Sequence, residues 1–140
     1  MTRARWARGA ARTAKVVLAT CCVAAAAPIA AESILQFDQW MQKIDRRSQS
    51  MQRDLAAHAP AAALSDAREI GELYRLMQDY FVRRGDNSED AVKLSRDGAA
   101  LADAVAGLVQ ENDFDGALRS AGALTRACRD CHVRYKPLEP

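Results

Sequence analysis

The sequence predicts an all-α protein, an antiparallel four-helix bundle whose helices run up-down-up-down. After the first 31 residues, apolar side chains recur every three or four positions, the spacing of one face of an α-helix. Short segments rich in Gly, Pro, Asn or Asp separate four such stretches, and short connections favour antiparallel neighbours. No segment shows the sustained apolar–polar alternation of a half-buried strand.

Residues 1–31 are expected to be a secretory signal peptide that precedes a single domain, 32–140. The first fifteen positions contain five basic residues and no acidic one, an apolar stretch follows over 16–27, and small residues end it at Ala30-Ala31. This order is typical of export signals. The apolar stretch is shorter than the roughly 20 residues of a spanning helix, so cleavage near Ala30 or Ala31 is expected, with a retained anchor as the alternative.

Removal of the leader changes the charge of the chain. The full sequence has 20 Lys and Arg against 18 Asp and Glu, and five of the basic residues lie in 1–31, where no acidic residue occurs. The domain 32–140 therefore has 15 basic and 18 acidic side chains, a net charge of −3 with neutral histidines. This balance gives no support to nucleic-acid binding, and no stable membrane insertion is expected after cleavage.

The first helix is expected to begin after Ser33, a suitable cap, and to run toward His58. Ala59-Pro60-Ala61 should interrupt it, because proline disfavours helical geometry in the residue before it. The apolar stripe of this helix comprises Phe37, Met41, Ile44, Met51 and Leu55, with Ser48 and His58 on the same face.

The second helix is expected to begin at Ser65 or Asp66, with Glu69 completing a capping box behind Asp66. Gly85 is the expected C-terminal stop. The buried side should comprise Ile70, Leu73, Met77, Tyr80 and Phe81.

The third helix should begin after Asn87 or Ser88 and end at the turn 111–113. Its small residues would permit a close helix approach or leave room for a bulky group. They are Gly98, Ala99 and Ala102, on or beside a stripe of Ala91, Leu94, Gly98, Leu101, Val105 and Leu108.

The fourth helix should begin near Phe114. Its stripe comprises Leu118, Ala121, Thr125, Cys128, His132 and Tyr135. Because Cys128 and His132 continue this stripe, we expect them to face the interior of the bundle.

The segment Cys128-Arg129-Asp130-Cys131-His132 is the attachment motif of c-type haem. Each thiol can add to a haem vinyl group to form a thioether, while the imidazole coordinates the iron. At positions i, i+3 and i+4 of a helix, the three side chains face one side. Cys21 and Cys22 lie in the expected leader, so the domain has no other cysteine for a disulfide. The sequence thus predicts one covalently bound haem c.

Other chemistry for these residues has weaker support. Zinc would need a fourth ligand beside the motif's three, and the only other histidine, His58, is expected at the far end of the first helix. A thioredoxin-like cysteine pair belongs near a βαβ unit, and no strand is expected. No nucleophile–base arrangement for hydrolysis stands out, so we do not expect an enzyme.

The domain resembles class II c-type cytochromes, the cytochrome c prime family. These exported four-helix bundles carry Cys-x-x-Cys-His-x-x-Tyr followed by Arg or Lys close to the end of the last helix, and residues 128–136 match that pattern. The resemblance implies that Cys128 and Cys131 are the thioether sites and that His132 is the proximal iron ligand. It also implies that Lys136 lies near the proximal face of the haem, where its charge could influence the haem; a solvated lysine is the alternative.

The resemblance further implies a distal residue on the first helix, an aliphatic side chain or a methionine. Met41 lies nearer the start of that helix, which adjoins the end of the fourth helix in an antiparallel bundle, and Met51 lies roughly 15 Å further along. Arg47 favours Met51, because family members tend to place a propionate-binding arginine four residues before the distal residue. We prefer Met41 and keep Met51 as the alternative; either side chain could also be core filling alone.

With His and Met ligands, a c-type haem suits electron transfer. We therefore expect a periplasmic monohaem cytochrome that carries single electrons between redox partner proteins. The alternative is a pentacoordinate haem protein that binds or sequesters nitric oxide or carbon monoxide. The resemblance also implies that the protein could be a homodimer, an arrangement common in the family.

Overall fold

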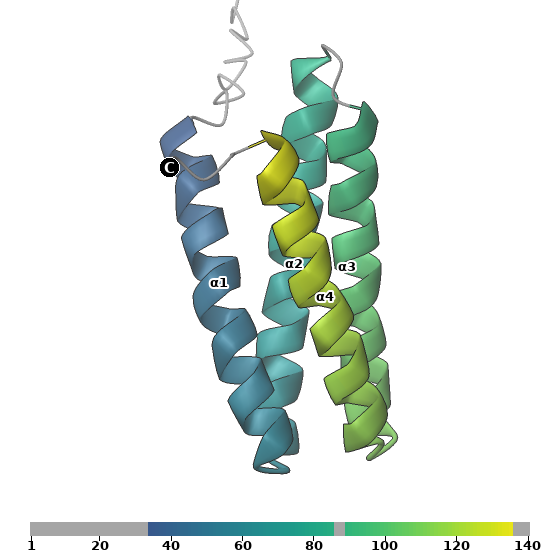
Figure 1. The fold of residues 1–140 in the computed structure, drawn as a ribbon. Helices are drawn as coiled ribbons and strands as arrows, with labels where there is room; N and C mark the ends of the chain where they lie inside the picture. The colour runs from purple at the N-terminus through teal and green to yellow at the C-terminus, as the bar shows by residue number, and fades with distance from the viewer. Residues whose placement is uncertain (1–33, 86–88, 136–140) are drawn as a thin grey trace, which may run out of the picture. The chain divides into compact units, whose positions relative to one another are not determined.

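Four α-helices make up the part of the chain that the computed structural model describes, residues 34–85 and 89–135. They are α1 (Ile34–Ala56), α2 (Pro60–Arg84), α3 (Glu89–Gln110) and α4 (Phe114–Tyr135) (Figure 1). No strand occurs in these two ranges. The expected leader, the expected caps Ser33, Asn87 and Ser88, and Lys136 lie outside the described residues.

The helices pack as a bundle in which each contacts its two neighbours in a ring. α1 packs on α2, α2 on α3 and α3 on α4, and α4 closes the ring against α1. Successive helices run in opposite directions (Figure 1). The predicted all-α, up-down-up-down four-helix bundle is confirmed. None of the helices described has the length and apolar character that crossing a membrane requires.

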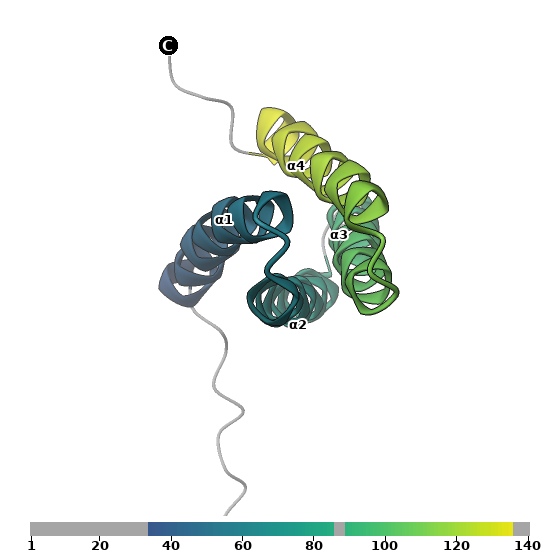
Figure 2. The ribbon, with the colours of Figure 1, turned by 90° about the horizontal axis from the view of Figure 1, so that it is seen from below.

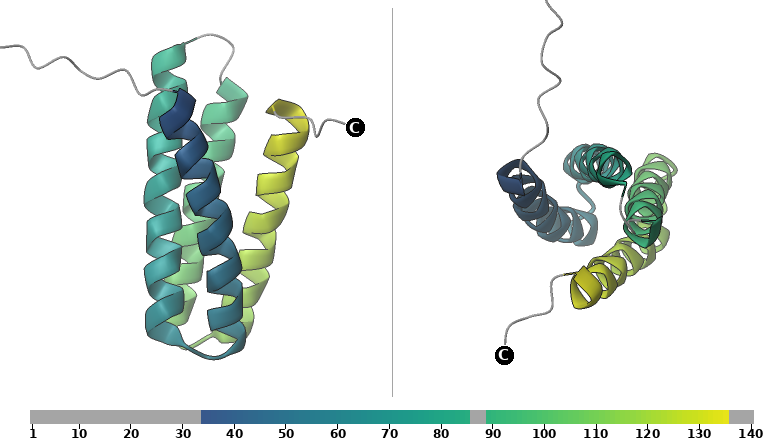
Figure 3. Two further views of the ribbon diagram at one scale, coloured as in Figure 1. Left: turned by 90° about the vertical axis from the view of Figure 1, so that its left-hand side faces the viewer. Right: turned by 90° about the horizontal axis from the view of Figure 1, so that it is seen from above.

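The α1–α4 pair is the loosest of the four helix pairs. Viewed along the bundle, α1 and α4 diverge toward the end where α1 begins and α4 finishes (Figures 2 and 3). Nearer the other end, Gln52 Nε2 of α1 donates a hydrogen bond to Thr125 Oγ1 of α4 at 2.9 Å. The last turns of α4, which contain the Cys-x-x-Cys-His motif, therefore lie beside this divergence.

Apolar side chains from all four helices form the core. α3 and α4 contribute mostly small ones, which lets neighbouring helices approach closely. In α3 the predicted stripe is only partly right, because Leu94, Leu101 and Leu108 are half-buried. The apolar side chains with at most 2% exposure are Ile44, Met51, Leu55, Ala63, Ala67, Ile70, Met77, Ala91, Ala102, Val105, Val109, Ala117, Ala121 and Leu124.

The start of α2 differs from the prediction. A break at Ala59 is present, but the expected start at Ser65 or Asp66, with its capping box, is wrong, because the helix already begins at Pro60. Proline suits the first turn of a helix, where its missing N–H has no intrahelical partner to lose and its fixed φ is already helical. Ser65 and Asp66 consequently lie within the helix, and Asp66 becomes a buried side chain.

The other two connections match the prediction. Gly85 follows α2 in the left-handed conformation, with φ of 71°, and its N–H donates to the carbonyl of Phe81. Such a φ is readily adopted by glycine, so the predicted stop at Gly85 is confirmed. Between α3 and α4, Asn112 also has positive φ (60°), and Asp113 Oδ1 accepts a hydrogen bond from the N–H of Gly116 at 2.8 Å. Asp113 thus caps α4, which begins at Phe114 as predicted.

The buried face of α4 is rotated relative to the predicted stripe. Leu118 and Tyr135 are 36% and 43% exposed, and Thr125 is also exposed, so these three placements are wrong. The reason is that α4 packs more extensively on α3 than on α1, which turns its inner face toward α3. The buried residues of this helix are Gly116, Ala117, Ala121 and Leu124.

Ion pairs join α1 to α2. Arg47 pairs with Asp66 Oδ1 at 3.1 Å and with Glu69 Oε2 at 2.6 Å, and Lys43 pairs with Glu69. The Asp66 side chain is only 5% exposed. A buried carboxylate without a partner is costly, so we infer that Arg47 compensates for the burial of Asp66.

Arg47→Met is expected to lower the free energy of unfolding by about 2 kcal/mol, because it leaves the buried Asp66 carboxylate unsatisfied. Urea titration followed by circular dichroism would measure the change. Arg46→Met is the matched control: Arg46 is exposed on the same helix, and its loss should cost no more than about 0.5 kcal/mol. Equal effects of the two substitutions would contradict a stabilising role for the pair.

Glu69 should make the stability depend on pH. The hydrogen bond from Lys43 and the positive charge of Arg47 hold the pKa of Glu69 below its ordinary value of 4.5, against the effect of partial burial. Because the folded-state pKa is lowered, this stabilisation is present at neutral pH and is lost as the pH falls below the ordinary value. Glu69→Gln should therefore destabilise the protein at pH 7, and the difference from wild type should shrink toward pH 3 in the same urea titration.

Candidate haem site

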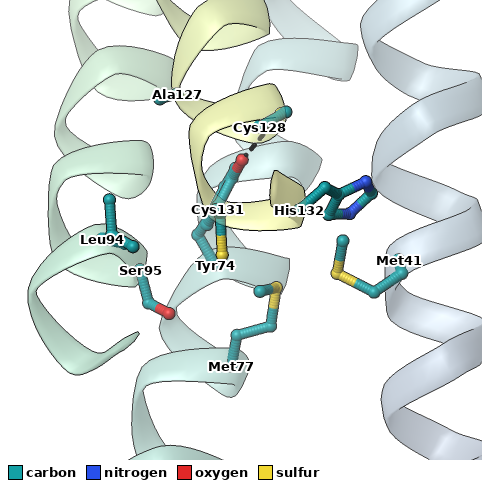
Figure 4. Close-up of a pocket in the computed structure, with 9 residues that line it drawn as sticks. All are labelled: Met41, Tyr74, Met77, Leu94, Ser95, Ala127, Cys128, Cys131 and His132. Atoms are coloured by element: carbon teal, nitrogen blue, oxygen red, sulfur yellow. Dashed lines mark hydrogen bonds between the residues drawn. The ribbon is translucent and has the colours of Figure 1, made fainter. Parts of the chain in front are cut away.

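A pocket lined from all four helices lies at the end of the bundle where α1 and α4 diverge (Figure 4). Its cavity volume is only about 10 Å³, the space of about one water molecule. Its nine lining residues are Met41, Tyr74, Met77, Leu94, Ser95, Ala127, Cys128, Cys131 and His132. No Asp, Glu, Lys or Arg is among them. The pocket is thus largely apolar and rich in sulfur.

The Cys-x-x-Cys-His motif contributes Cys128, Cys131 and His132 to this pocket. All three side chains are half-buried, and both cysteines are free thiols. Burial raises the pKa of both thiols above the ordinary value of 9.0; for Cys131 the nearby Cys128 acts in the same direction. Both sulfurs therefore remain protonated at neutral pH, a state in which thiols react slowly with oxidants and metals.

Met41 of α1 extends toward the His132 ring of α4 (Figure 4). Met51, the alternative distal ligand, is fully buried in the core and does not line the pocket. Arg47, the feature that favoured Met51, is paired with Asp66 and Glu69 of α2. The structure therefore brings Met41, and not Met51, together with the motif, and iron ligation by Met41 stays a prediction.

Tyr74 is a pocket residue that the sequence analysis missed. Its Oη lies 3.0 Å from Cys128 Sγ, within hydrogen-bond distance (Figure 4). Burial, reinforced by Cys128, raises the pKa of Tyr74 well above 10, so the phenol stays neutral. A sequence signal was available: Tyr74 lies four residues after Ile70 and three before Met77, on the same helical face.

Met77 and Ser95 also line the pocket without having been expected there. Met77 was expected only as a core residue of α2, and it is 2% exposed. The Ser95 hydroxyl donates a hydrogen bond to the carbonyl of Ala91 at 2.8 Å, one turn earlier in α3. Its hydrogen therefore points at the helix backbone and not into the pocket. Met77 consequently places a second thioether sulfur beside the motif.

Of the two remaining candidates, only His58 belongs to the described residues. Lys136 is outside the described residues. His58 is exposed in the loop after α1, with φ of 51°, and its ring lies 4.5 Å from that of Phe114; its expected place on the stripe of the first helix is therefore wrong. Within 34–85 and 89–135, no group of three or more His, Cys, Asp and Glu side chains is arranged to hold a metal ion.

Aromatic rings join three helices near the pocket. The Phe37 ring of α1 packs against those of Tyr80 and Phe81 of α2, at 4.9 and 5.5 Å between centroids. Phe81 in turn lies 6.5 Å from Tyr135 of α4. These contacts hold α1, α2 and α4 together at the end where α1 and α4 diverge.

Comparisons with known proteins identified no relative of this chain. A scan against protein-family models and searches of curated proteins and of solved structures found no match. The resemblance to class II c-type cytochromes therefore stays a prediction from the sequence.

Proposed function

We propose that this protein is an exported, periplasmic monohaem c-type cytochrome that carries single electrons between partner proteins. One haem c would be attached through thioethers to Cys128 and Cys131, with His132 as the proximal ligand and Met41 as the distal ligand. The observation that supports this proposal is the arrangement of both thiols, the imidazole and the Met41 thioether around one pocket.

The residues of the pocket fit this group. The two thiols of Cys128 and Cys131 would bind the two vinyl groups of haem, and the His132 imidazole and the Met41 thioether would hold its iron, the ligand set of an electron-transfer cytochrome. Leu94, Ala127 and Met77 give the pocket an apolar lining. The cavity of about 10 Å³ is far below the roughly 300–1,000 Å³ of ligand sites, so at least the flexible side chains of Met41 and Met77 must change rotamer to admit a large ligand.

When bound, haem supplies a one-electron couple between ferrous and ferric iron. His132 would be held in place by the last turns of α4, and the Met41 sulfur would stabilise ferrous iron and raise the potential. The apolar lining would limit the access of water to the iron. The extent of this access also affects the reduction potential. Charged side chains at the surface, outside the pocket, would orient the partner proteins.

The optical spectrum of the exported protein, produced in a host that attaches haem covalently, tests this function. We expect one haem per chain, a low-spin spectrum, and a weak methionine-to-iron charge-transfer band at the red end of the oxidised spectrum. A high-spin spectrum that changes readily with carbon monoxide would instead support the gas-binding alternative. Protein that acquires no haem would contradict both.

A further inference from the structure

The two thiols of the motif have different surroundings. The Cys128 sulfur lies 3.0 Å from the hydroxyl of Tyr74, a residue of α2 that is 6% exposed. Cys131 makes no side-chain hydrogen bond to any residue of the described ranges. One sulfur of the pair is therefore held by a polar contact across the bundle, and the other is not.

Gly98 of α3 makes room for the tyrosine ring. A Cβ atom at Gly98 would lie 2.4 Å from Tyr74 Cε1 and 2.6 Å from Cδ1, closer than such atoms approach in proteins. The ring of Tyr74 thus fills the position that a side chain on α3 would occupy. α2, α3 and α4 together determine where the hydroxyl lies.

We propose that Tyr74 is a positioning residue that donates a hydrogen bond to the sulfur of Cys128 in the haem-bound protein and thereby holds one edge of the haem. This inference rests on the proposed function. A thiol can donate or accept a hydrogen bond, but a thioether sulfur has no hydrogen and only accepts. Haem attachment therefore leaves the tyrosine as the donor.

The direction of this hydrogen bond has an electrostatic consequence. The positive end of the O–H dipole points at the sulfur and the attached edge of the haem. Reduction removes one positive charge from the iron, so a positive dipole end nearby favours the reduced form. Tyr74 should therefore raise the reduction potential, in the way that other hydrogen bonds near a haem tune it.

Tyr74→Phe in the haem-bound protein tests the inference, because phenylalanine keeps the ring and removes only the hydroxyl. We expect a lower midpoint potential than wild type in a spectroelectrochemical titration. We also expect the loss of a hydroxyl proton signal that, in the reduced wild type, shows a nuclear Overhauser effect to the Cys128 β-protons. An unchanged or higher potential would overturn the proposal.

Tyr80→Phe is the matched control. Tyr80 is a second buried tyrosine of α2, 7% exposed, whose hydroxyl accepts a hydrogen bond from Arg84 and does not line the pocket. Its replacement should leave the potential unchanged. An equal fall in both variants would show a general effect of lost hydroxyl groups and would overturn the specific role of Tyr74.

Gly98→Ala moves the hydroxyl while retaining it. The new methyl group must displace the Tyr74 ring, so the potential should fall as it does in Tyr74→Phe. Gly107→Ala is the control on the same helix, because a Cβ at Gly107 meets nothing within 4 Å. A wild-type potential in Gly98→Ala would count against positioning by Tyr74.

Infrared spectra separate the failure of this inference from that of the proposed function. In a reduced, haem-free preparation whose helices are verified by circular dichroism, Tyr74→Phe should shift the S–H band of Cys128 and leave that of Cys131 unchanged. If wild type takes up no haem but this shift occurs, the contact stands and the proposed function fails. If wild type holds haem and Tyr74→Phe changes neither the potential nor the band, the inference alone fails.

Discussion

Replacing both Cys128 and Cys131 with serine is expected to abolish covalent haem attachment while leaving the four helices intact. A serine hydroxyl is a far weaker nucleophile than a thiol and does not form a stable bond to a haem vinyl group. Both side chains are half-buried at the edge of the core, so the substitutions should cost little stability. Denaturing gel electrophoresis with a haem stain would measure attachment, and circular dichroism would measure the helices.

The two single variants are the controls for this experiment. Cys128→Ser and Cys131→Ser each leave one thiol, so each should retain haem through denaturation by a single thioether. The pyridine haemochrome band should then move to longer wavelength, because one vinyl group remains unsaturated. Haem that survives denaturation in the double variant would contradict attachment at this motif.

Met41→Ala is expected to convert the haem from low-spin to high-spin and to open the iron to carbon monoxide. The structure places Met41 in the pocket with His132, and alanine has no donor atom to replace the thioether sulfur. Loss of the methionine ligand should also lower the reduction potential. Optical spectra with and without carbon monoxide, and a potentiometric titration, would measure these changes.

Met51→Ala should lower the stability of the protein without changing the spin state of the haem. Met51 is fully buried in the core, so its truncation should cost about 2–5 kcal/mol of stability and leave the spectrum of the folded protein low-spin. Met77→Ala tests the second sulfur of the pocket and should also remain low-spin. Conversion to high-spin by Met51→Ala or Met77→Ala alone would show that the Met41 assignment is wrong. A wild type that is already high-spin would favour gas binding.

The fold was predictable because its signals are local. Helical periodicity located the four helices, and residues such as Gly85 and Asn112 marked the turns. The error at α2 has a physical cause: proline stops the helix before it but can begin the next one. The sequence predicted Ser65 or Asp66 as the cap of this helix. In the structure, Asp66 lies within the helix and forms an ion pair with Arg47 of α1.

Which face of α4 is buried could not be derived from its own sequence. The helix offers apolar residues on more than one side, including Leu118 and Tyr135, which are exposed. Its rotation follows from its more extensive packing on α3 than on α1. The choice of α3 over α1 as the main packing partner depends on both helices, so no pattern within the sequence of α4 indicates it.

The candidate site also has a part that the sequence predicts and a part that it does not. Cys128, Cys131 and His132 form a contiguous motif whose chemistry is evident from their spacing. Tyr74 belongs to another helix, and its role depends on the space left by Gly98. Such a contact joins positions far apart in the chain, so only the packed structure reveals it.

Peptide mapping of the exported wild-type protein by mass spectrometry tests covalent haem attachment most directly. Trypsin cleaves after Arg126, Arg129 and Arg134, which separates Ala127–Arg129, with Cys128, from Asp130–Arg134, with Cys131. Two thioethers would hold these peptides together through one haem, and a reductant that breaks a disulfide would not separate them. We predict this linked species as the main product; two unmodified peptides after reduction would contradict covalent haem attachment.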